Sequence, residues 1–98
     1  MSHELKTDLL PFGDLWNRVK AFEVRKNDRD YQLSDELLLK EWTGLGFTGR
    51  WIRAEVSYIN EGGQYGIEPG YVVLGIFEID RSSSPLTDDD EIFIREAA

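Results

Sequence analysis

The chain has 98 residues, of which 41% are hydrophobic and none is cysteine. This length allows one hydrophobic core, and the composition is that of an ordinary globular domain. The lack of cysteine excludes disulfides, thiolate metal sites and thiol nucleophiles. No apolar run approaches the roughly 20 residues needed to cross a bilayer, and the first residues lack the pattern of a secretory signal. We therefore expect a cytoplasmic protein with no membrane partner.

The formal net charge is −8, and half of it falls in the last 19 residues. An acidic chain is repelled by nucleic acid, whose binding depends on neutralising phosphates. Five cations nevertheless fall within 12 residues, namely Arg18, Lys20, Arg25, Lys26 and Arg29. Acidic residues lie among them, so charge alone leaves two interpretations open: a local cationic patch or an ordinary mixed-charge surface.

The first part of the chain predicts a strand, a helix and a second strand. A short strand at 3–6 is followed by apolar residues at spacings of three and four, the stripe of an amphipathic helix with Asp8 as its N-cap. The stripe consists of Leu9, Phe12, Leu15, Trp16 and Val19. Alternation at 22–25 then predicts a strand that runs into a charged turn at 26–30.

The remainder predicts three strands separated by glycine-containing turns at 43–46 and 61–70. Residues 37–39 are apolar throughout, and their short run favours a buried strand while leaving a helix open. Residues 51–59 alternate, and their buried side is expected to carry Ile52, Ala54, Val56 and Tyr58. Residues 71–79 are rich in Val, Ile and aromatic residues. These elements indicate a small α+β fold whose sheet closes into a barrel.

The composition divides the chain into a domain at 1–80 and an acidic C-terminal tail at 81–98. A serine run opens the tail, and an acidic run at 88–91 precedes Ile92-Phe93-Ile94. The tail is expected either to float or to dock as an edge strand through Ile92 and Ile94. In both cases it offers an acidic surface to a protein partner.

The single histidine and the three tryptophans can each be interpreted as structural residues, and for two of the tryptophans a role in ligand stacking stays open. His3, the only histidine, is expected at the surface or at a strand end. Trp16 is expected in the core, whereas Trp42 and Trp51 are either packed or exposed as stacking platforms. Gly62-Gly63 lacks the spacing of a phosphate-binding loop, and the acidic run lacks that of a calcium loop. We expect no cofactor and no metal.

Three segments of the chain carry a resemblance to a known group of domains. They are His3-Glu4-Leu5-Lys6, Phe22-Glu23-Val24-Arg25-Lys26-Asn27-Asp28-Arg29-Asp30 and Glu61-Gly62-Gly63-Gln64-Tyr65-Gly66. They resemble a bacterial and phage subfamily of ASCH-like domains in the PUA superfamily. The resemblance implies a PUA-like β-barrel with one or two short helices, and a cleft between helix and barrel that holds RNA or a modified nucleoside. The residues that match are Lys20, Glu23, Arg25, Lys26, Asn27, Asp28, Arg29, Gln64 and Tyr65.

The chemistry of these residues suits that ligand. Arginine offers a fork for phosphate or a base edge, the amides of Asn27 and Gln64 can donate to and accept from a base, and Tyr65 or Trp42 can stack on one. The alternative is a turn in which Arg25 and Arg29 simply pair with Asp30 or Asp35. Two glycines of the subfamily are replaced here, by Arg18 and Ser34.

Two other functions stay open. The wider superfamily also contains small amidohydrolases that remove acetyl from N4-acetylcytidine. Their mechanism resembles that of a threonine nucleophile assisted by a lysine. Lys20 matches their lysine, but Glu23 stands at the threonine position, which argues against acyl transfer. A hydrolase in which Glu23 acts on water as a general base is the first alternative. A protein–protein adaptor that uses the acidic tail is the second.

Overall fold

A computed structural model describes residues 1–82, so the expected tail elements at 83–98 lie outside the described residues. The elements in chain order are β1 (Ser2–Asp8), α1 (Leu9–Trp16), β2 (Phe22–Lys26), β3 (Glu36–Trp42), β4 (Phe47–Glu61) and β5 (Tyr71–Arg81). Each predicted strand is present, and 37–39 is part of a strand. Across residues 1–82 no helix is long and apolar enough to cross a membrane.

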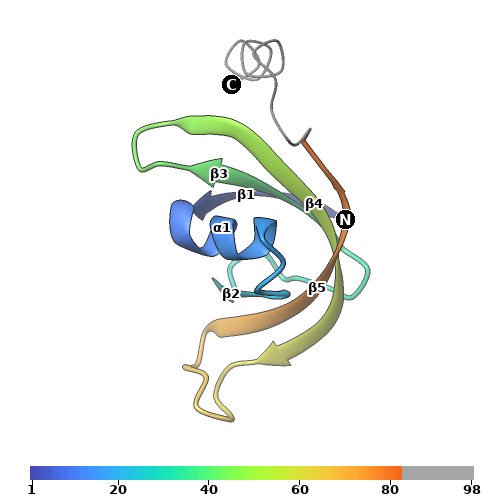
Figure 1. Ribbon diagram of the computed structural model, residues 1–98. Coiled ribbons are helices and arrows are strands. Elements are labelled where there is room, and N and C mark those ends of the chain that lie inside the picture. Colours follow the sequence, from blue (N-terminus) through green and yellow to red (C-terminus); the bar gives the residue numbers. More distant parts are fainter. Residues whose placement is uncertain (83–98) are drawn as a thin grey trace.

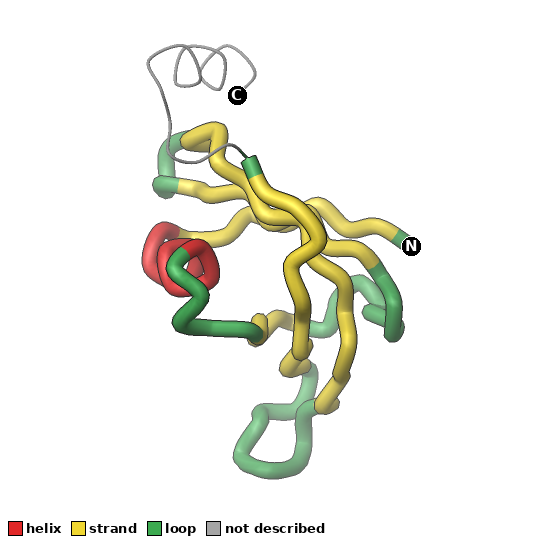
Figure 2. The backbone as a smooth tube through the Cα atoms, turned by 45° about the vertical axis from the view of Figure 1, so that its right-hand side comes forward, coloured by secondary structure: helices red, strands yellow, loops and turns green. Residues whose placement is uncertain are grey.

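The five strands form one sheet in the order β1-β3-β4-β5-β2. β1 pairs with β3 in parallel, and the other neighbours are antiparallel. The sheet curls into a half-barrel, and α1 lies inside the curl (Figures 1 and 2). The expected small α+β fold with a barrel-like sheet and one short helix is confirmed at this level. The order puts the first two strands of the chain, β1 and β2, at opposite edges of the sheet.

Strict alternation of side chains builds the core. In β3, Leu37 and Leu39 are fully buried while their neighbours are half-exposed, as the period of two requires. The remaining buried apolar residues come from β1, α1, β4 and β5 or from the turn before β3: Leu5, Phe12, Leu15, Tyr31, Ile52, Ala54, Val56, Val72, Leu74 and Ile76.

The prediction of which β4 side chains are buried is correct only as far as Val56. Tyr58 is 64% exposed, because an irregularity between Val56 and Tyr58 shifts the register against β5. Ile59 packs against the core instead. β4 also begins at Phe47 rather than near Trp51, since Phe47 pairs with Trp42 of β3.

α1 is shorter than its apolar stripe. Phe12 and Leu15 are buried, Trp16 is half-buried against the core, and Val19 is exposed beyond the helix end. Asp8 occupies the N-cap position but its side chain makes no capping hydrogen bond. The helix stops before Arg18, whose φ of 59° is left-handed and cannot continue a right-handed helix.

Arg18 and Ser34 stand where the resembled subfamily has glycine, and both are left-handed, with φ of 59° and 71°. We expect Arg18→Gly and Ser34→Gly each to raise the free energy of unfolding by about 0.5–1 kcal/mol, because the left-handed conformation costs a residue with a Cβ more than glycine. The exposed Arg18–Glu78 ion pair at 3.5 Å offsets little of this gain.

Urea denaturation checks both substitutions, with Ser57→Gly as the control. Ser57 lies in β4 and has no positive φ, so glycine there only adds flexibility to the unfolded chain and is expected to destabilise the protein. Destabilisation by the glycine variants of Arg18 and Ser34 would contradict the prediction.

Candidate functional site

The structure distributes the predicted site residues over several places. Arg25 and Arg29 line a pocket between β1 and β2, whereas Asn27 and Gln64 line a separate polar cavity. Lys20 borders a small apolar groove beside α1. Glu23 is buried, Lys26 and Asp28 are exposed, and Tyr65 is 86% exposed outside both the pocket and the polar cavity.

Glu23 is the centre of an ion network inside the half-barrel. It is 3% exposed, Lys20 Nζ lies 3.1 Å from its Oε1, and Arg25 Nε donates to its Oε2 at 2.9 Å. Lys20 and Glu23, three positions apart, therefore form an ion pair. Because both carboxylate oxygens are held by cations, Glu23 is arranged as a structural counter-ion rather than as a base with access to water.

The same arginine ties the two edges of the sheet together. Arg25 Nη1 donates to the Lys6 carbonyl at 2.9 Å, and its Nη2 donates to Thr7 Oγ1 at 2.9 Å. Arg29 Nη1 donates to the Glu4 carbonyl at 3.1 Å. These three hydrogen bonds form what we call the arginine seam, which joins β2 and the turn after it to β1.

The turn-building alternative proved wrong for these arginines. Arg25 and Arg29 contact β1 and Glu23 rather than Asp30 or Asp35. The reason is the curl of the sheet, which brings the edge of β1 within reach of both guanidinium groups. Thr7, only 2% exposed, belongs to this arrangement and was not predicted.

The pocket beside the arginine seam, here called the cationic pocket, has a volume of about 420 Å³. Its lining residues are Glu4, Leu5, Lys6, Arg25, Arg29, Lys40 and Phe47. Four cations thus face one carboxylate, although the whole chain has a net charge of −8. Lys6 and Lys40 are direct partners in the β1–β3 register, a like-charge pairing that costs stability.

Aromatic rings support the two lysines. Lys6 Nζ lies 4.3 Å from the Trp42 ring and Lys40 Nζ lies 4.3 Å from the Phe47 ring. The two rings meet edge to face at 4.8 Å. Lys40 Nζ also lies 3.6 Å from the exposed Glu4 carboxylate. The rings hold the ammonium groups at the pocket by cation–π attraction.

Residues 2–76 match a protein family described as "Domain of unknown function (DUF3850)". The chain belongs to this family. It is also similar to an "Uncharacterized 12.9 kDa protein in GpA 3'region" of Escherichia phage P2, with 36% identity over 59 residues. That alignment covers 60% of this chain and 54% of the relative, so it spans about half of the relative's length.

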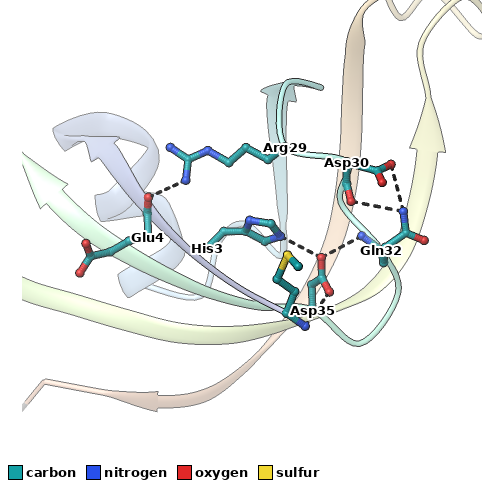
Figure 3. A network of polar contacts seen from close by, with 7 residues as sticks. His3, Glu4, Arg29, Asp30, Gln32 and Asp35 are labelled. Carbon is teal, nitrogen blue, oxygen red and sulfur yellow. Dashed lines mark hydrogen bonds and ion pairs between the residues drawn. The ribbon is translucent and has the colours of Figure 1, made fainter.

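The DUF3850 domain has a second polar cluster at the start of the sheet, shown in Figure 3. His3 is 7% exposed near the start of β1, so the expected strand-end position is confirmed and the surface position is wrong. Its Nε2 lies 2.8 Å from Asp35 Oδ2. Asp35 also accepts from the backbone N–H of Gln32 at 2.9 Å and from the N-terminal ammonium group of Met1 at 3.1 Å. Burial opposes ionisation, but these donors outweigh it and lower the pKa of Asp35 to about 2.

A third buried carboxylate, Glu41, forms a bidentate pair with Arg50 at 2.7 and 2.9 Å. Burial raises the pKa of Glu41, but hydrogen bonds from Arg50 and Thr48 outweigh this and hold it below its usual value. The Arg50 guanidinium in turn lies 4.6 Å from the Trp16 ring. Like Asp35, Glu41 therefore serves the packing of the DUF3850 domain. Within residues 1–82 no three histidine or carboxylate side chains converge as metal ligands.

The polar cavity lies on the other side of the turn that follows β2. Its volume is about 670 Å³, and Asn27, Asp30, Tyr31, Glu61 and Gln64 contribute polar groups to it. Ile59 and Val72 are among its apolar lining residues. The DUF3850 domain thus brings Asn27 and Gln64 together as expected, but separately from Arg25 and Arg29.

Proposed function

We propose that this DUF3850 domain is a cytoplasmic module that binds RNA, or a phosphorylated modified nucleoside, with phosphate in the cationic pocket. The observation that carries the proposal is the convergence of Lys6, Lys40, Arg25 and Arg29 around a single carboxylate in an otherwise acidic chain. Such a pocket attracts phosphate locally even though the far field of the protein is negative. The resemblance to ASCH-like domains, and with it a PUA-like barrel, supports the same ligand class.

The two arginines have different roles in this proposal. Arg25 already uses Nε, Nη1 and Nη2 in hydrogen bonds, so it builds the pocket wall. Arg29 makes one hydrogen bond among the described residues, to the Glu4 carbonyl, which leaves most of its donors for phosphate. Lys6 and Lys40 add point charges beside it.

The geometry does not favour the hydrolase alternative. A general base on water needs an oxygen that water can reach, but Glu23 is only 3% exposed and its two oxygens face Lys20 and Arg25 inside the half-barrel. The adaptor alternative depends on the tail predicted at 81–98, of which residues 83–98 lie outside the described residues.

Fluorescence anisotropy with short single-stranded RNA at 50 and 200 mM salt tests the proposal. We expect binding that weakens steeply with salt, and Arg29→Ala and Lys40→Ala each to weaken it by about tenfold at low salt, as loss of a phosphate contact does. Arg18→Gly removes a cation outside the pocket and is expected to change affinity less than twofold. An RNA affinity that is the same at both salt concentrations would exclude the cationic pocket as the phosphate site. So would a loss of affinity in Arg18→Gly as large as that in the pocket variants.

A further inference from the structure

The polar cavity differs from the cationic pocket in charge. Its lining residues include Asp30 and Glu61 but no lysine or arginine. Gln32 Nε2 donates to Asp30 Oδ1 at 3.1 Å and to the Asp30 carbonyl at 3.2 Å, which fixes this carboxylate at the cavity. A phosphate is therefore repelled from the polar cavity, whereas a neutral ligand that carries N–H donors is attracted to it.

Two further polar groups of the cavity have no hydrogen-bond partner among residues 1–82. The first is the Tyr31 hydroxyl, on a residue that is only 6% exposed. Every fully enclosed side-chain N or O atom of the described residues is hydrogen-bonded, so this hydroxyl keeps some exposed surface. Tyr31 lines the polar cavity, and the charges that act on its hydroxyl are those of Arg25, Arg29, Asp28 and Glu23. Burial raises the pKa of Tyr31 against the opposing charges of Arg25 and Arg29, which keeps the hydroxyl protonated at neutral pH.

The second is the Asn27 side-chain amide. The Asn27 backbone is fixed by its N–H, which donates to the Gly70 carbonyl at 2.8 Å, so the amide is presented from an anchored position. An asparagine amide can donate and accept at the same time, and it pairs with adjacent donor and acceptor atoms on a nucleobase edge. Ile59, which is half-buried, supplies apolar surface for the base.

One short segment of chain lines both the cationic pocket and the polar cavity. Arg29 lines the cationic pocket and Asp30, the next residue, lines the polar cavity. Asp30 has a φ of 48°, and this left-handed turn lets the two side chains leave in opposite directions (Figure 3). A ligand with an anionic part and a donor-bearing part can therefore engage both sides of the segment.

We propose that the polar cavity is a base subsite for nucleobases with an exocyclic amino group, adenine, cytosine or guanine, in preference to uracil. The carboxylates of Asp30 and Glu61 accept from the amino group, while Asn27 and the Tyr31 hydroxyl complete the hydrogen bonds to the base edge. This inference rests on the proposed function only for the phosphate part of the ligand. Uracil has no exocyclic amino group and offers a carboxylate only its ring N3–H, which is flanked by two carbonyl oxygens that a carboxylate repels.

The test compares hexamers of adenylate, cytidylate and uridylate by anisotropy at fixed salt. We expect the adenylate and cytidylate hexamers to bind about tenfold more tightly than the uridylate hexamer, as one good base-edge pairing provides. Asn27→Ala and the isosteric Tyr31→Phe are expected to reduce this ratio to below threefold with the salt dependence unchanged. Arg29→Ala is the matched control, which weakens all three hexamers equally and keeps the ratio.

A second measurement removes the phosphate. Titration of the ¹⁵N-labelled protein with adenosine, cytidine or uridine is expected to shift the side-chain amide signals of Asn27 for the first two nucleosides only. If RNA binds with salt dependence but without base preference, the base subsite is wrong and the phosphate site stands. If adenosine and cytidine shift the Asn27 amide signals but RNA affinity does not depend on salt, the base subsite stands and the phosphate site is wrong. If neither occurs, both are wrong.

Discussion

Arg25→Ala is expected to lower the free energy of unfolding by about 3 kcal/mol, the usual cost of removing one partner of a buried ion pair. Among residues 1–82, Glu23, at 3% exposure, would keep only Lys20 as a counter-ion. The Lys6 carbonyl and the Thr7 hydroxyl would also lose a hydrogen bond each. Loss of RNA binding in this variant would therefore report on folding rather than on direct contact with phosphate.

Urea denaturation followed by tryptophan fluorescence measures this effect, with Arg29→Ala as the control. Arg29 contributes one exposed hydrogen bond to the arginine seam, so its replacement is expected to cost less than about 1 kcal/mol. Equal stability of the two alanine variants would mean that the Glu23 network does not hold the half-barrel together.

Phe12→Ala is expected to lower the free energy of unfolding by about 4 kcal/mol, in the range found when a buried aromatic side chain is deleted from a core. Phe12 has no exposed surface, its ring stacks on Trp16 at 5.8 Å, and the Arg50 guanidinium lies 5.3 Å from it. Since α1 has only eight residues, this one side chain is a main anchor of the helix in the sheet.

Leu10→Ala is the matched control in the same helix. Leu10 is 83% exposed, so its truncation is expected to change the free energy of unfolding by less than about 0.5 kcal/mol. Similar losses in Phe12→Ala and Leu10→Ala would show that α1 does not pack into the half-barrel as described.

Much of the fold could be predicted because its strands follow local rules. Alternation in 51–59 and the apolar run at 37–39 both produce strands with one buried face. The early start of β4 could not be predicted from its own residues, since it depends on the pairing of Phe47 with Trp42. The exposure of Tyr58 depends on a register shift against β5, which is likewise a property of two strands.

The candidate site was predicted only in part, for a related reason. Arg25 and Arg29 belong to one motif and do meet in the cationic pocket, but Lys6 and Lys40 lie 34 positions apart and meet only through the parallel pairing of β1 with β3. Composition could not reveal that pairing. Conversely, Tyr65 was predicted because it matches the loop of the resembled subfamily, yet it lies outside both the pocket and the polar cavity.

The arginine seam also bears on whether the edge of β1 can add a strand from another molecule. An edge strand with unoccupied backbone groups can add the strand of another molecule, which is a route to aggregation. In β1 the carbonyls of Glu4 and Lys6 already accept from Arg29 and Arg25, so a foreign strand would have to displace two guanidinium groups to pair there. The same side chains that close the half-barrel thus protect its first edge from intermolecular strand addition.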